Sequence, residues 1–219
     1  MLNVLQTYLE DINLIDGRLI EEWGMSVYET TSRYLRSNAD LCQLPSDDRS
    51  LVVRTAAVSV SCLGSTLITR NYPLYAIDIF KNTISNVYGE DVINKHRRSM
   101  KFIDSDTVFL KLALSLFVFS ELNYSYVSIV SSDSTNVLNV LEVQNRYAEV
   151  TWKYLLYRYG HDQAVRRFLT LTSWFLATTL YIGDMQSLSP QVNNVTSLVE
   201  ETELKLVLDD IDRVTEINE

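Results

Sequence analysis

The segment that decides the fold reads Tyr34-Leu-Arg-Ser-Asn-Ala-Asp-Leu-Cys-Gln-Leu-Pro-Ser-Asp-Asp-Arg-Ser-Leu-Val-Val-Arg54. It contains the end of an amphipathic helix, a turn marked by Pro45 and the start of a second helix. Ser46 follows the proline and is expected to act as the N-cap, because its hydroxyl can accept a hydrogen bond from a free amide of the first turn. The segment therefore predicts two consecutive helices joined by a short turn.

The second of these helices is expected to lie in the centre of the protein. Asp47 and Asp48 sit in its first turn, where the helix dipole favours negative charge, and we interpret them as structural. From Leu51 to Ile68 the residues are apolar or small on nearly every face. A helix that is apolar all round is typical of one packed between two layers.

The composition favours an all-α domain. The chain has 219 residues, of which 47% are hydrophobic, enough for one substantial core. Six glycines and three prolines are too few for a turn-rich β fold, and apolar residues recur at helical spacing along most of the length. We expect a single domain over residues 1–219, with helices over about 2–15, 21–42, 46–68, 76–87, 108–122, 135–159 and 161–188, and an extended turn or a short β-hairpin near 69–75.

Charge and cysteine content exclude several kinds of protein. The net charge of −9 disfavours nucleic-acid binding by this domain, because phosphate contacts need a basic surface. Cys42 and Cys62 are too few for a zinc module or a disulfide framework, so no metal site is expected. The longest apolar stretch, Val108 to Phe119, is too short to span a membrane, and no signal peptide is evident. We expect a soluble intracellular protein with no membrane contact.

Catalysis is not expected. His96 and His161 are the only histidines, and neither lies in the spacing of a nucleophile or a metal ligand. His96 belongs to the polar stretch Asn94 to Ser99, which predicts an exposed position. The chain also has no glycine-rich phosphate loop.

The opening segment resembles the signature of the nuclear receptor ligand-binding domain. The family pattern consists of an aromatic, an apolar and a basic residue, two spaced apolar residues, an acidic pair with a polar partner, two aliphatic residues and a base. The residues that match it are Tyr34, Leu35, Arg36, Leu41, Leu44, Asp47, Asp48, Arg49, Val52, Val53 and Arg54. Three later segments resemble the family's eighth, ninth and tenth helices in the correct order: Leu116–Ser120, Val143–Tyr147 with Tyr154, and Arg167-Phe168.

Two positions depart from the family. Ser59 replaces a glutamate that commonly pairs within the domain, and Gly64 replaces an arginine that often holds a polar group of the ligand. The resemblance implies a three-layer antiparallel helical sandwich. It also implies a nuclear, ligand-regulated transcription factor domain that binds a lipid, a sterol or another small apolar molecule, and that recruits a coregulator peptide of the Leu-x-x-Leu-Leu type.

The resemblance implies a coregulator site. Arg36 and Arg54 would flank a groove whose floor includes Leu51, and Asp209 would face Arg36 from the C-terminal acidic segment, residues 190–219. The run Leu206-Val-Leu-Asp-Asp-Ile211 resembles the family's activation helix, and Leu198 to Leu204, with Glu201 as its acid, is a rival. A solvated tail is the alternative, because charge runs are usually exposed.

Two further sites follow from the resemblance. The residues that could line a ligand cavity are Trp23, Val27, Thr31, Ser61, Cys62 and Ser65, although ordinary packing explains them as well. The helix from Ala164 has apolar faces too broad for one-sided burial, so we expect an interface with a second copy or another receptor at Phe168, Leu171, Thr172 and Phe175. A ligand-independent dimerisation partner with a filled pocket, or an unrelated all-α scaffold, remains an alternative.

Overall fold

The computed structural model describes residues 22–120, 134–186 and 189–217, and all regular structure within them is helical. The all-α prediction is therefore confirmed, and the first expected helix, over 2–15, lies outside the described residues. A helix over residues 22–37, called here the 22–37 helix, comes first. It is followed by α2 Ala39–Gln43, α3 Ser46–Asn71, η1 Leu74–Ala76, α4 Asp78–Tyr88, α5 Glu90–Ser99, η2 Met100–Phe102, α6 Thr107–Val118, α7 Ser134–Tyr159, α8 His161–Gln186 and α9 Ser189–Ile217.

Helix α3 lies at the centre, as its sequence predicts. It contacts α5, α6, α7, α8 and α9, and Val52, Val53, Ala56 and Leu63 are fully buried. Its length and composition would also suit a membrane span, but 67% of its most apolar window is buried inside the described structure. The core thus forms around one helix whose small side chains let several neighbours approach it.

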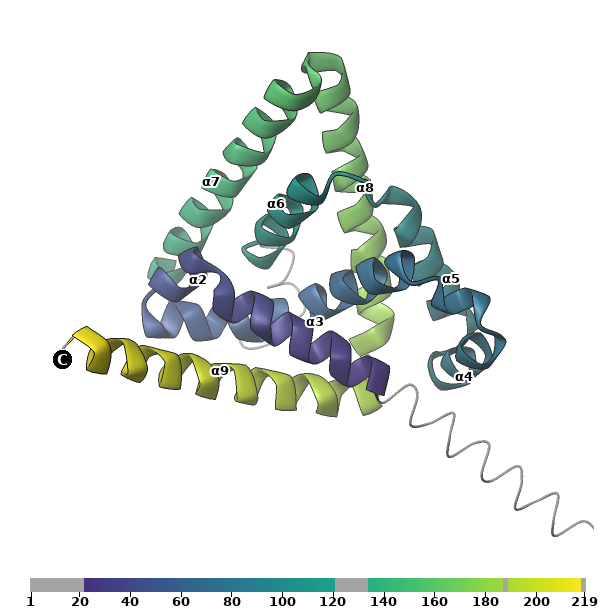
Figure 1. Ribbon diagram of the computed structural model, residues 1–219, viewed down its shortest axis with the longest axis horizontal. Coiled ribbons are helices and arrows are strands. Elements are labelled where there is room, and N and C mark those ends of the chain that lie inside the picture. The colour runs from purple at the N-terminus through teal and green to yellow at the C-terminus, as the bar shows by residue number, and fades with distance from the viewer. Residues whose placement is uncertain (1–21, 121–133, 187–188, 218–219) are drawn as a thin grey trace, which may run out of the picture.

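Helices α6, α7 and α8 form a frame on one side of α3 (Figure 1). α7 and α8 are joined at Gly160, whose φ of 73° lies in the left-handed region that favours glycine at the end of a helix. Asp106 is the N-cap of α6, and its carboxylate accepts hydrogen bonds from the amides of Val108 and Phe109.

The same carboxylate ties the frame together. Asp106 Oδ2 accepts hydrogen bonds from the hydroxyls of Tyr154 and Tyr159, both at 2.6 Å, so that one side chain of α6 holds the end of α7. Asp104 pairs with Arg167 of α8, and the Arg167 guanidinium lies 3.8 Å from the centre of the Tyr159 ring. We call Asp104, Asp106, Tyr154, Tyr159 and Arg167 the frame cluster.

Two local predictions and one alternative of a third are wrong. Of the two alternatives for 69–75, the hairpin is wrong, because α3 continues to Asn71; the chain then turns at residues 72–73 and enters a 3₁₀ helix. The helix expected over 21–42 is interrupted at Asn38, whose side chain accepts a hydrogen bond from the Leu41 amide and so caps a separate short helix, α2. Ser46 makes no capping bond; Pro45 occupies the N-cap, and Ser46 is already the first helical residue.

Helix α9 is one continuous helix of 29 residues that runs along the base of the molecule, beside the 22–37 helix and α3 (Figure 1). The solvated-tail alternative does not describe its middle part, since Leu198, Thr202 and Leu206 are at most 4% exposed. These residues are four apart and therefore form one stripe on the helix.

Candidate helix-docking groove and internal cavity

Helix α9 lies in a groove whose two walls are the 22–37 helix and α3. At one end, Leu198 of α9 packs in a cluster with Tyr28 and Ala57. In the middle, the Thr202 hydroxyl donates a hydrogen bond of 3.0 Å to the hydroxyl of Ser32. Further along, Leu206 packs in a cluster that contains Leu35, Val53 and Ala56. The stripe of α9 thus contacts both walls at Leu198 and Leu206, and the 22–37 helix at Thr202.

Arginines on the walls bind carboxylates of α9. Arg36 donates to Asp209 through Nε at 2.8 Å and Nη2 at 2.7 Å, a bidentate pair. Arg49, which is largely buried, donates to Asp210 at 2.6 Å. Arg54 donates to Glu203 at 2.8 Å through Nε. We call Arg36, Arg49 and Arg54 the arginine wall.

Two of these ion pairs shift the pKa of their arginine. Hydrogen bonds to Asp209 raise the pKa of Arg36 above its ordinary value, and hydrogen bonds to Glu203 do the same for the pKa of Arg54. Both arginines stay charged at every accessible pH, so the walls present permanent positive charge to the groove. This charge is local, since the whole chain carries −9.

The structure rearranges the predicted coregulator site. Arg36 and Asp209 do not bracket a space for a peptide, because their side chains touch. Arg54 lies on the same surface, and Leu51 is only partly buried. Sequence reasoning missed that Asp210 and Glu203 each meet an arginine. The available signal was the spacing of acidic residues along one helix. It could not be matched to arginines that lie 149 and 161 residues away in the sequence.

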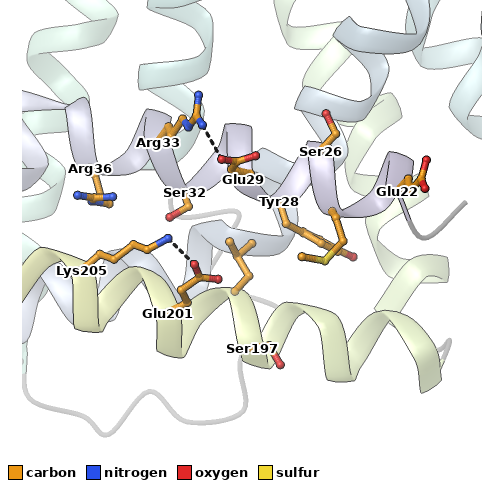
Figure 2. Close-up of a pocket in the computed structure, with 12 residues that line it drawn as sticks. Glu22, Ser26, Tyr28, Glu29, Ser32, Arg33, Arg36, Ser197, Glu201 and Lys205 are labelled. Atoms are coloured by element: carbon orange, nitrogen blue, oxygen red, sulfur yellow. Dashed lines mark hydrogen bonds and ion pairs between the residues drawn. The ribbon is translucent and has the colours of Figure 1, made fainter. Parts of the chain in front are cut away.

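The rival segment, Leu198 to Leu204, also belongs to α9. Leu198 and Thr202 face the groove, whereas Glu201 pairs with Lys205 of its own helix (Figure 2). Beside this face lies an open cleft of about 1050 Å³ between the 22–37 helix and α9, lined among others by Tyr28, Ser32 and Leu198. Both candidate activation segments are therefore parts of one docked helix.

The predicted ligand-cavity residues lie together. Trp23, Val27, Ser61, Cys62 and Ser65 line one cavity, and Thr31 lies behind it, where its hydroxyl accepts a 3.4 Å hydrogen bond from Ser61. The cavity measures about 20 Å³, which is room for one water molecule. The side chains that fill it, Tyr28, Tyr88 and Tyr181, were not singled out from the sequence.

His96 lies beside this cavity and is 2% exposed, so the expectation of an exposed histidine is wrong. The polar run around it hides an apolar stripe, since Val92, Ile93 and His96 share the inner face of α5. Burial lowers the pKa of His96 to about 4, so the ring is neutral. Tyr75 donates to Nδ1 at 2.7 Å, and Nε2 lies 3.3 Å from Ser65 Oγ, which itself donates to a backbone carbonyl. These roles place the ring proton on Nε2.

The predicted interface helix, α8, presents a different face from the one expected. Leu171 is 3% exposed, the Phe175 ring packs 4.5 Å from Phe117, and Phe168 packs against Trp152. Of the four predicted residues only Thr172 is exposed. The outward stripe comprises Leu169, Thr172, Leu176 and Leu180, and its leucines are 57–67% exposed.

Within the described residues, no three His, Cys, Asp or Glu side chains gather as a metal site would require. Comparisons with models of protein families, with curated proteins and with solved structures find no match to this chain. Membership of the nuclear receptor family therefore stays a prediction from the sequence motifs.

Proposed function

We propose that this chain is a protein-interaction domain of a nuclear transcription regulator. In this proposal it has the three-layer helical architecture of the nuclear receptor ligand-binding domain, whose signature its sequence resembles. The groove between the 22–37 helix and α3 binds an amphipathic helix, and two copies of the domain dimerise through α8. The observation that supports it is α9 itself. A helix with one apolar stripe and flanking carboxylates lies in the groove and is held by the arginine wall.

A ligand-independent domain is the form that the geometry favours. Small-molecule sites usually measure about 300–1,000 Å³. The cavity at the predicted ligand position measures about 20 Å³. Organic extraction of the purified protein followed by mass spectrometry should yield no stoichiometric lipid or sterol. One bound molecule per chain would instead favour the ligand-regulated receptor.

Charge reversal in the groove tests the docking function. In a variant whose groove has been freed of α9, Arg36→Glu should weaken binding of an amphipathic helical peptide by about tenfold or more, because a charge-assisted bidentate pair becomes a repulsion. Arg33→Glu is the matched control, since Arg33 is exposed and pairs with Glu29 of its own helix. Equal peptide affinity in the two variants would contradict the proposal, as would the absence of any peptide binding.

Dimerisation is the second part of the proposal. Leu169, Leu176 and Leu180 form an exposed apolar stripe on α8, and such a stripe suits a two-fold interface between identical helices. The proposal assigns no DNA contact to this domain, because its net charge of −9 disfavours the phosphate contacts that DNA binding requires.

A further inference from the structure

The attachment of α9 differs from that of the core helices. Among the described side chains of α9, Leu198 and Leu206 are the large apolar ones that are buried. Midway between them, α9 is held by the hydrogen bond from the Thr202 hydroxyl to the Ser32 hydroxyl. Val199 also packs against the clusters of Leu198 and Leu206. At the groove edges three ion pairs add to the attachment, and in each of them at least one side chain is 29% or more exposed. Ion pairs of this exposure contribute little stability each and are screened by salt.

The chemistry of the walls also selects what can lie there. Arg36, Arg49 and Arg54 are matched by carboxylates at positions 203, 209 and 210 of α9. A neutral helix would leave three guanidinium groups without anionic partners, one of them on a side chain only 10% exposed. Leaving such a group unpaired is unfavourable, so the groove discriminates in favour of acidic helices.

From these contacts, and on the basis of the proposed function, we infer that α9 closes the groove in cis and that the partner is an acidic amphipathic helix of another protein, which must displace α9. The docked face of α9 defines the sequence pattern expected of the partner. The pattern has two leucines eight residues apart, as at 198 and 206, and a small hydroxyl residue midway between them, as at 202. Its carboxylates lie at the positions that correspond to 203, 209 and 210. The exposed edges make exchange feasible, and the paired carboxylates make it selective.

Closure in cis has a measurable consequence. The apparent dissociation constant of a partner rises by the reciprocal of the fraction of molecules whose groove is open. A variant in which α9 is released should therefore bind the partner helix more tightly than the parent chain. Higher ionic strength should help release α9 but also weaken the partner's own pairs, so mutation is the cleaner test.

The experiment uses the full chain and a fluorescent synthetic peptide that copies residues 196–210. Asp209→Lys combined with Asp210→Lys places two cations against Arg36 and Arg49 and should release α9. Anisotropy should then show peptide affinity about tenfold or more above that of the parent chain. Glu200→Lys with Asp162→Lys is the matched control. It makes the same change of net charge at two exposed positions away from the arginine wall, and it should behave like the parent.

Four results separate the alternatives. A parent chain that binds the peptide as tightly as the released variant, with α9 still protected from hydrogen exchange, would overturn closure in cis. Preference of the released variant for a neutral Leu-x-x-Leu-Leu peptide would overturn the acidic partner and leave the proposed docking function intact. Intermolecular energy transfer between copies labelled on α9 and on the 22–37 helix would assign the groove to a second copy and overturn a foreign partner. Failure of every variant to bind any helical peptide would remove the proposed function as well.

Discussion

The frame cluster and the groove of α9 both join helices through carboxylates, yet they differ in how many bonds converge. In the frame, the single carboxylate of Asp106 accepts from two tyrosine hydroxyls and two backbone amides and so joins α6 to α7. In the groove, the bonds are spread over Asp209, Asp210 and Glu203, each facing one guanidinium at a partly exposed edge.

The difference indicates which part of the molecule is fixed and which can move. Hydrogen bonds that converge on one partly buried group reinforce one another, and losing that group leaves several polar partners unpaired. Bonds spread along an exposed edge can be broken one at a time, as is typical of segments that open locally without global unfolding. The frame should therefore unfold only with the whole domain, and α9 should detach first.

The largest effect is expected at Asp106. Asp106→Ala removes the cap of α6 and the acceptor for Tyr154 and Tyr159, and should lower the free energy of unfolding by roughly 4 kcal/mol. Urea titration followed by circular dichroism measures it. Asp162→Ala is the control, because the Asp162 side chain is 95% exposed and should change stability little. A loss below about 1 kcal/mol for Asp106→Ala would show that the frame is held mainly by apolar packing.

Acid should weaken the body of the domain through His96. Burial lowers its folded pKa to about 4 from 6.5, so the unfolded chain binds the proton first. Stability is therefore full above pH 6.5 and is lost as the pH falls towards 4, by about 3 kcal/mol for a shift of this size. His96→Gln should flatten this part of the stability profile measured by urea titration. An unchanged slope between pH 6.5 and 4 would mean that other groups cause it.

Protonation of Asp106 should cause a second loss of stability at lower pH. Burial acts to raise its pKa, but the hydrogen bonds from Tyr154, Tyr159 and two amides outweigh it and lower the pKa to about 2. The stabilisation is complete above the ordinary value of 3.8 and is lost as the pH falls through about 2. In urea titrations, this second loss of stability should persist in His96→Gln and disappear in Asp106→Asn.

A smaller effect is expected on the outer face of the frame. Leu176→Glu places a charge in the exposed stripe of α8 and should weaken self-association by about 2 kcal/mol, seen by sedimentation equilibrium. Stability of the monomer should hardly change, because Leu176 is 57% exposed. Leu208→Glu, 50% exposed on α9, is the control. Identical association of both variants with the parent would remove α8 as the interface.

In the groove we expect a much smaller change in global stability than at Asp106. Asp209→Lys should lower the melting temperature by only a few degrees, since a partly exposed ion pair contributes about 1 kcal/mol. Protection of amides in α9 should nevertheless fall in this variant. A large drop in melting temperature, equal to that of Asp106→Ala, would show that α9 is an integral part of the core.

Local sequence signals predicted most of the helices, because the spacing of apolar residues is set within a few positions along the chain. They failed at His96, where a polar run concealed one buried position per turn. They also failed at Asn38, where a side chain interrupted an apparently continuous helix. Tertiary packing buries His96, and a side-chain cap at Asn38 ends one helix and starts the next. The spacing of apolar residues reports neither of these contacts.

The groove shows the same limit. Arg36 and Asp209 were selected as members of one site, but only the path of α9 determines that they touch and that Arg49 and Asp210 join them. Likewise, five of the six candidate ligand-pocket residues line one small cavity, whereas the volume of that cavity depends on Tyr88 and Tyr181 from other helices. Residue types indicate which groups can interact; packing determines whether space remains between them.

Hydrogen exchange of the parent chain, read at α9 residues 198–210 and at frame residues 154–159, tests the central claim most directly. We expect α9 amides to exchange through a local opening that becomes more populated with added salt, while frame amides exchange only with global unfolding and respond little to salt. Equal protection of the two regions, with the same insensitivity to salt, would contradict a detachable helix in the groove.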